Sequence, residues 1–212
     1  RDAARALIHK GEKRGIPVLI ESLDFPSTDT YPFYDLEIAK DLAYFCGVDF
    51  PENRRYDTRT WRNWWEQHGR DVDLHQNLSV MERIHAALRS PNEAQGIRIF
   101  EKLRSEMPEN DVVRNRYDRF CYEWITYRLM TRERIGRAVL ERCLRLQKIR
   151  TELDPGDPEK WSSLAYYHGR LAQYDAAVSA VRSALQIDPA NPAYLEKLKA
   201  YESLLQKRRK SS

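Results

Sequence analysis

Side chains that could perform acid–base, metal or nucleophilic chemistry are present in this sequence, but not at the spacings such chemistry needs. The five histidines never fall two to a helical turn, so no helix-borne metal pair is predicted. Cys46, Cys121 and Cys143 lie far apart among apolar residues, which predicts buried free thiols and favours a reducing compartment. There is no glycine-rich phosphate loop, HExxH, GxSxG or CxxC. We therefore expect no catalytic residue, no metal and no cofactor.

Positive charge is concentrated between Val112 and Arg150. This segment has eleven Lys and Arg against four Asp and Glu, a local excess of +7 compared with +4 for the whole chain. Four of the cations recur at helical spacing and predict one stripe beside an apolar one: Arg134, Arg137, Arg145 and Lys148. The stripe is either a solvated helix face or a docking surface for an acidic protein. Nucleic acid is the less favoured partner, because acids interrupt the stripe and no recognised reading module accompanies it.

Three of the five tryptophans fall within Thr58–Gly69, TRTWRNWWEQHG. Trp61, Trp64 and Trp65 are spaced i, i+3, i+4, so they share one face of a short helix. Burying all three would contribute at most about 11–19 kcal/mol, as much as the whole stability of a domain. We therefore predict a buried structural joint between two parts of the chain. An aromatic platform for a sugar or a nucleobase is the alternative, and contact with a partner protein is a third.

The elements that would position these side chains are helices. Apolar residues recur with helical periodicity almost everywhere, and no alternating pattern is long enough for a sheet. No apolar run approaches the roughly 20 residues that span a bilayer, so we predict no membrane span. The sequence opens as RDAARALIHKG, which resembles the middle of a helix. We therefore expect further sequence upstream, and the location stays open between cytoplasm and periplasm.

The first 70 residues or so resemble a known repeat. RDAARALIHKGEKRGIPVLIESL followed by LEIAKDLAYFCG is similar to bacterial HEAT repeats of the PBS-lyase-like kind. The stretch that ends in the tryptophans resembles what often closes such arrays. The segment Asp24–Tyr34 departs from the pattern, because it is longer and richer in proline and aromatics than a usual turn. This resemblance includes enzymes that attach bilin pigments, but no pigment-handling residue can be carried over.

The segment Pro158–Asn191 resembles a tetratricopeptide (TPR) repeat, whose period is 34 residues. The matching positions are Trp161, Leu164, Ala165, Tyr174, Ala177, Ala184 and Pro189. Two positions depart from the family: His168 replaces an aromatic residue, and Ala172 stands where glycine is common. His168 is either a helix-packing or a groove-lining residue. One repeat cannot bury its own apolar face, so the predicted helix pair Leu78–Leu88 and Glu93–Glu106, and the pairs after it, are expected to continue the stack.

Together these patterns predict an all-α superhelix, or helical-repeat solenoid. We expect HEAT-like repeats over residues 1–56, the Trp-rich joint over 57–76, TPR-like repeats with a C-terminal capping helix over 77–206, and a basic tail over 207–212. The predicted function is a non-catalytic scaffold, adaptor or accessory subunit of a larger bacterial assembly. A bilin-lyase-like enzyme and a weak nucleic-acid binder that uses 112–150 are the alternatives. The predicted partner contacts are the basic stripe together with Ser162, Tyr166, His168 and Gly169.

Overall fold

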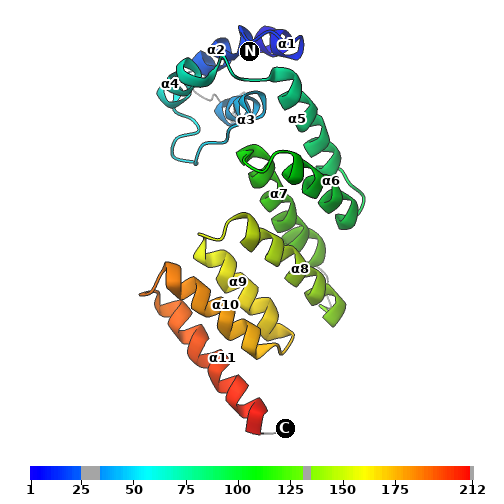
Figure 1. The fold of residues 1–212 in the computed structure, drawn as a ribbon, viewed down its shortest axis with the longest axis vertical. Helices are drawn as coiled ribbons and strands as arrows, with labels where there is room; N and C mark the ends of the chain where they lie inside the picture. The colour runs from blue at the N-terminus through cyan, green and yellow to red at the C-terminus, as the bar shows by residue number, and fades with distance from the viewer. Residues whose placement is uncertain (25–33, 131–134, 211–212) are drawn as a thin grey trace. The chain divides into compact units, whose positions relative to one another are not determined.

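The structure is a computed structural model that describes residues 1–24, 34–130 and 135–210 (Figure 1). These residues form helices and connecting turns with no strand among them, which confirms the prediction of an all-α protein. None of the described helices is long and apolar enough to cross a membrane. The chain divides into two compact units, Arg1–Arg116 and Tyr117–Ser212.

The first unit holds the helices up to the beginning of α7. Their bounds are α1 Asp2–His9, α2 Gly15–Glu21, the 3-10 helix η1 Ser22–Asp24, α3 Tyr34–Cys46, α4 Thr58–His68, α5 Leu74–Leu88, α6 Glu93–Glu106 and α7 Asp111–Glu123. Helices α1 and α2 approach closely because Gly15 has no side chain: a Cβ there would lie 2.4 Å from the carbonyl oxygen of Ala4. Helix α2 in turn packs against α3 and α4, so its buried residues Ile16, Leu19 and Ile20 form part of the core.

The pair α5/α6 belongs to the same compact unit as α1–α4, although the sequence groups it with the later pairs. The physical reason is the contact between α3 and α5. Asn77 Nδ2 donates a hydrogen bond to the carbonyl oxygen of Phe45 at 2.9 Å. The same amide also lies against Gly47, whose φ of +72° turns the chain at the end of α3.

The second unit continues α7 and adds four further α-helices. Its elements are the π-helix η2 Trp124–Leu129, α8 Arg137–Leu153, α9 Pro158–Arg170, α10 Tyr174–Ile187 and α11 Pro192–Lys210. Successive helices from α8 to α11 pack against one another, and α9, α10 and α11 lie side by side (Figure 1). Small residues permit this close packing: Ala165, Ala177 and Ala184 are fully buried.

Helices α9 and α11 begin in the same way, 34 residues apart. Each has proline as its first residue, Pro158 and Pro192, where the absent N–H costs no hydrogen bond. Helix α11 differs from the predicted cap in its length. The sequence predicts an end at Gln206 and a separate basic tail, whereas the helix continues to Lys210. Contacts with the preceding helix pair favour the longer helix, because Arg208 Nη1 donates to the carbonyl oxygen of Ala172 at 2.6 Å.

Replacing Ala172 by glycine should stabilise the second unit by about 0.5–1 kcal/mol. Ala172 joins α9 to α10 with a φ of +56°, a conformation that costs a residue with a Cβ about 1–2 kcal/mol. The greater freedom of glycine in the unfolded chain removes part of that gain. Urea unfolding followed by far-UV circular dichroism measures the change. The matched control, Ala176→Gly inside α10, should lose about 1 kcal/mol instead, and the same sign for both variants would contradict the argument.

Candidate functional site

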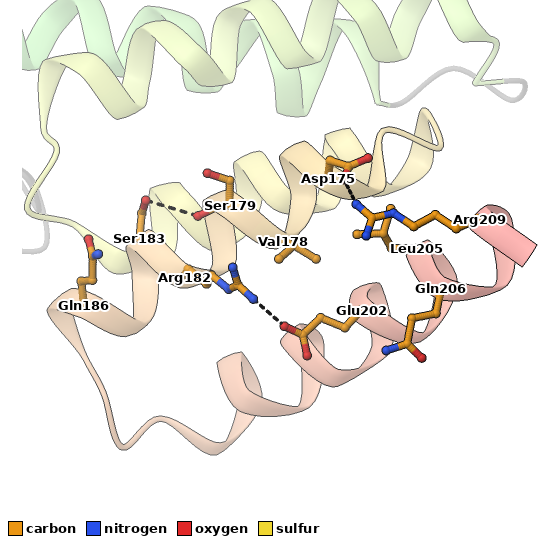
Figure 2. A pocket seen from close by; sticks show the side chains of 10 residues that line it. All are labelled: Asp175, Val178, Ser179, Arg182, Ser183, Gln186, Glu202, Leu205, Gln206 and Arg209. Atoms are coloured by element: carbon orange, nitrogen blue, oxygen red, sulfur yellow. Dashed lines mark hydrogen bonds and ion pairs between the residues drawn. The ribbon is translucent and has the colours of Figure 1, made fainter.

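A groove of about 670 Å³ lies between α10 and α11 in the second unit (Figure 2). Its apolar lining comes from Val178 of α10 and Leu205 of α11, and the other lining side chains are polar or charged. Ser179 and Ser183 follow Val178 along α10, where the Ser183 hydroxyl donates to the carbonyl oxygen of Ser179 at 3.3 Å. An extended polar groove with a small apolar centre suits a segment of another protein better than a compact substrate.

Two ion pairs cross this groove from α10 to α11. Arg182 Nη2 lies 2.8 Å from Glu202 Oε1, and Arg209 Nη2 lies 3.1 Å from Asp175 Oδ1. All four side chains are at least 39% exposed, so each pair contributes at most about 1 kcal/mol. A bound partner can therefore replace these pairs with its own charges at a small cost in free energy.

These groove residues are not among those predicted from the sequence, although a signal for them exists. Asp175 and Arg182 are seven residues apart on α10, and Glu202 and Arg209 are seven apart on α11. Seven residues are close to two helical turns, so each helix presents one acid and one base on the same face. Opposite charges in this pattern on consecutive helices indicate paired faces.

Two of the predicted partner contacts, Ser162 and Gly169 on α9, are covered by α11. Ser162 is 2% exposed, and Lys197 Nζ donates a hydrogen bond to its hydroxyl at 2.5 Å. A Cβ on Gly169 would lie 2.4 Å from Cε1 of Tyr201, so only glycine lets that ring approach α9. Helix α11 therefore occupies the surface on which these two residues are expected to meet a partner.

The other two predicted contacts on α9 differ in exposure. His168 is 8% exposed, and its Nδ1 lies 2.7 Å from Gln173 Oε1. Burial lowers the pKa of His168, so the ring favours its neutral form and packs between helices. Tyr166 is 37% exposed, and its hydroxyl accepts a hydrogen bond from Arg170 Nη1 at 2.7 Å. Of the four residues predicted on this helix, Tyr166 is the most open to a partner.

Only part of the basic stripe lies within the residues that the structure describes. Arg134 lies outside the described residues. Arg137, Arg145 and Lys148 lie on α8 and are exposed, and Arg137 Nε is 2.9 Å from Glu141 Oε1. Their spacing places them within about 80° of one another around the helix. The three cations therefore share one broad face of α8, as the spacing predicts, while their role as a docking surface stays a prediction.

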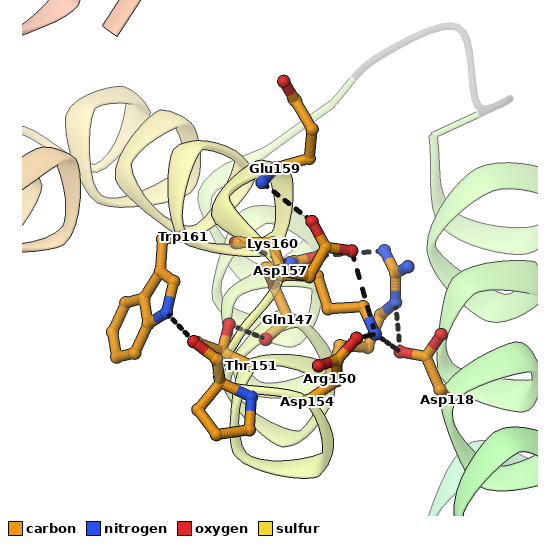
Figure 3. A network of polar contacts seen from close by, with 10 residues as sticks. Asp118, Gln147, Arg150, Thr151, Asp154, Asp157, Glu159, Lys160 and Trp161 are labelled. Atoms are coloured by element: carbon orange, nitrogen blue, oxygen red, sulfur yellow. Dashed lines mark hydrogen bonds and ion pairs between the residues drawn. The ribbon is translucent and has the colours of Figure 1, made fainter. Parts of the chain in front are cut away.

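A polar network holds the end of α7 against α8 and α9 (Figure 3). Its centre is the Lys160 ammonium group, whose side chain is 9% exposed and lies within 4.0 Å of Asp118, Asp154 and Asp157. Arg150 Nε also donates to Asp118 Oδ1 at 2.9 Å. This network links α7, α8 and α9, and together with the packing of α8 against α9 it contributes to the angle between those two helices.

The tryptophans of α4 occupy two environments. Trp61 is fully buried: its ring lies 4.7 Å from that of Phe50, and its Nε1 donates to the carbonyl oxygen of Arg55 at 2.7 Å. Trp64 and Trp65 are half-buried. Trp61 is therefore a core residue of the first unit, whereas the joint between two repeat arrays stays a prediction.

The three cysteines and Tyr194 are buried side chains. All three cysteines are buried and none forms a disulfide bond, which confirms the prediction, and burial raises the pKa of the Cys46 thiol. Tyr194 of α11 is 2% exposed and donates a hydrogen bond to Glu159 Oε1 at 2.5 Å. Desolvation and this carboxylate raise the pKa of Tyr194 to about 12. The Tyr194 hydroxyl, which joins α11 to α9, therefore stays protonated across the physiological pH range.

Comparison with known proteins does not assign this chain to a family. No protein-family model matches it, and no curated protein is significantly similar to it. Among the residues that the structure describes, no group of three or more histidines, cysteines or carboxylates could hold a metal ion.

Replacing Gly169 by alanine should weaken the attachment of α11 by up to about 2 kcal/mol, because the usual cost of overpacking a tight contact, about 1–3 kcal/mol, is partly offset by the roughly 1 kcal/mol that alanine gains over glycine within a helix. The new methyl group would displace the ring of Tyr201, because Cε1, Cζ and the hydroxyl oxygen all lie within 2.8 Å of it. Hydrogen exchange along α11 should become faster than in the wild type. In the double variant Gly169→Ala/Tyr201→Leu much of the protection should return, and its failure to return would show that the clash is elsewhere.

Proposed function

We propose that the protein is a non-catalytic helical-repeat scaffold that binds a protein partner, as an adaptor or an accessory subunit of a larger assembly. In this proposal residues 77–206 are TPR-like repeats and residues 1–56 are HEAT-like repeats. The observation that carries it is the relation between α9 and α11. Tyr194 contacts Glu159, and Lys197 contacts Ser162, each across 35 positions of sequence. In helical-repeat proteins each helix pair stacks on the pair before it, so a helix contacts its counterpart one repeat earlier.

The partner, in this proposal, lies in the groove between α10 and α11. Two weak ion pairs and a short apolar strip line that groove. An amphipathic helix with one or two apolar side chains and charges of both signs would complement it. The exposed cations Arg145 and Lys148 of α8 favour a second, acidic region on the same partner.

A groove-filling variant tests this proposal. The full chain, immobilised, should capture a defined set of proteins from the source cells, quantified by mass spectrometry. Ser179→Trp places a large side chain in the groove at an exposed position and should abolish capture. Lys199→Trp, exposed on α11 outside the groove, is the matched control and should capture normally. Equal capture by both variants would exclude the groove as the binding site.

The acidic region of the partner is tested separately. Substituting Arg137, Arg145 and Lys148 together by alanine should reduce capture mainly through a slower association rate, and more at low ionic strength than at high. Unchanged capture would remove the stripe from the proposal. Filter binding of single-stranded DNA at two salt concentrations tests the nucleic-acid alternative, and retention that falls steeply with salt would favour it.

A further inference from the structure

A second hollow, of about 250 Å³, lies in the first unit beside α4 and the loop that precedes it. Helix α4 contributes Arg59, Asn63, Trp64 and Gln67, and the loop contributes Phe50 and Arg54. The α4 residues recur at i, i+4, i+5 and i+8, so they form one stripe along the helix. The hollow thus combines an aromatic surface, two cations and two side-chain amides in a small space.

The aromatic surface is held in place from behind. Trp64 is half-buried, and its ring lies 6.4 Å from that of the fully buried Trp61 and 5.3 Å from that of His68. Phe50 packs edge-on against Trp61 at 4.7 Å. Because Trp61 belongs to the core, the rings that line the hollow are anchored before any ligand arrives. Such preorganisation lowers the entropy cost of stacking a ligand on Trp64.

The two arginines of the hollow have no carboxylate partner within 4.0 Å among the residues that the structure describes. Their neighbours in sequence behave differently: Arg55 lies 3.4 Å from Asp49, and Arg62 lies 2.8 Å from Glu21. Instead, the guanidinium carbon of Arg54 lies 5.7 Å from the centre of the Phe50 ring. Arg59 is exposed at the edge of the hollow. The hollow therefore offers two cations that form no ion pair among the described residues, although the charge of Arg59 acts on the nearby Asp57.

One carboxylate does line the hollow, but it already has partners. Asp57 caps α4, where its Oδ2 accepts hydrogen bonds from the backbone N–H of Thr60 at 2.9 Å and from the Thr60 hydroxyl at 2.5 Å. The hydrogen bond from the Thr60 side chain is the main reason that the pKa of Asp57 is lowered. Asp57 remains ionised at neutral pH, and two arginines against one aspartate leave the lining with a net positive charge.

We propose that this hollow binds a purine mononucleotide, a role distinct from the partner binding proposed above. The base stacks on Trp64, and the phosphate lies between Arg54 and Arg59, whose guanidinium groups match phosphate geometry. The amides of Asn63 and Gln67 can each donate and accept, as the N6/N7 edge of adenine requires. Two cations are enough to bind one phosphate monoester. A protein that binds a nucleic-acid strand needs a row of basic side chains that follows successive phosphates.

Isothermal titration calorimetry of the full chain with adenosine 5′-monophosphate tests the proposal. We expect binding at one site with a Kd between about 1 µM and 1 mM, as a ligand of this size permits. Trp64→Ala should weaken binding by about 5- to 150-fold, the effect of losing one stacked base, and Trp64→Phe should retain most of it. Arg54→Gln and Arg59→Gln should each weaken binding at least about tenfold.

The matched control is Arg62→Gln, which removes an arginine from the same helix outside the hollow and should bind normally. Ribose 5-phosphate and adenosine should each bind more weakly than the complete nucleotide. Several results would overturn the proposal: no binding at millimolar nucleotide, an equal loss in Arg62→Gln and Arg59→Gln, or equal affinity for ribose 5-phosphate. Tighter binding of single-stranded oligoadenylate per site would assign the hollow to nucleic acid instead.

Discussion

Trp61→Ala should destabilise the first unit by about 4–5 kcal/mol, near the upper end for a core substitution. The indole is 0% exposed and is among the largest fully buried side chains of the described chain. Its removal leaves a cavity next to Phe50 and takes away the donor that satisfies the carbonyl oxygen of Arg55. Because whole domains are stable by only about 5–15 kcal/mol, a large part of the margin is lost. Urea unfolding followed by far-UV circular dichroism measures the shift of the midpoint.

Trp64→Ala is the matched control for this experiment. It removes the same side chain one helical turn away, but from a half-buried position, so the loss should stay near about 1 kcal/mol. Hydrogen exchange should locate the Trp61 effect in α4 and in the loop before it. Equal losses for the two variants would mean that the helix is held by its whole aromatic face and not by one buried ring.

Helix positions could be predicted where a local signal marks both ends. The predicted bounds of α6, Glu93–Glu106, are those observed, because Asn92 caps the helix through the N–H of Gln95 and Pro108 follows it closely. Helix α5 begins at Leu74 instead of the predicted Leu78. Asp73 is the reason: its side chain accepts a hydrogen bond from the N–H of Gln76 at 3.0 Å. The first turn of α5 is mostly polar, so apolar periodicity alone does not predict it.

The candidate sites were harder to predict, because helical spacing says which residues share a face but not what covers it. Ser162 and Gly169 share a face of α9 with Tyr166, yet α11 covers the first two and leaves the third exposed. The tryptophans of α4 illustrate the same limit of sequence-based prediction. Their spacing places Trp61 and Trp64 on one face of the helix, although only Trp61 is fully buried. Burial depends on the docking of neighbouring helices, which local sequence does not encode.

Lys160→Met should destabilise the second unit by about 2–3 kcal/mol. The ammonium group lies 3.0 Å from Asp154, 3.4 Å from Asp118 and 4.0 Å from Asp157, so its loss leaves three carboxylates facing one another. Removing one partner of a fully buried pair costs about 3–5 kcal/mol. The loss here should be smaller, because Asp154 is 51% exposed and Asp118 keeps Arg150. Methionine retains the buried methylene groups, which isolates the effect of the charge.

The dependence of the stability loss on salt concentration distinguishes this network from a surface ion pair. The Lys160 side chain is 9% exposed, and its backbone carbonyl accepts a hydrogen bond from the Gln147 amide at 2.9 Å, so solvent ions have little access to it. Most of the difference between wild type and Lys160→Met should therefore persist at about 1 M salt, where exposed charges are screened within about 3 Å. Lys148→Met, on the exposed face of α8, should change stability by less than about 0.5 kcal/mol. A Lys160 effect that disappears in salt would place the ammonium group in solvent, and the angle between α8 and α9 would then depend on apolar packing alone.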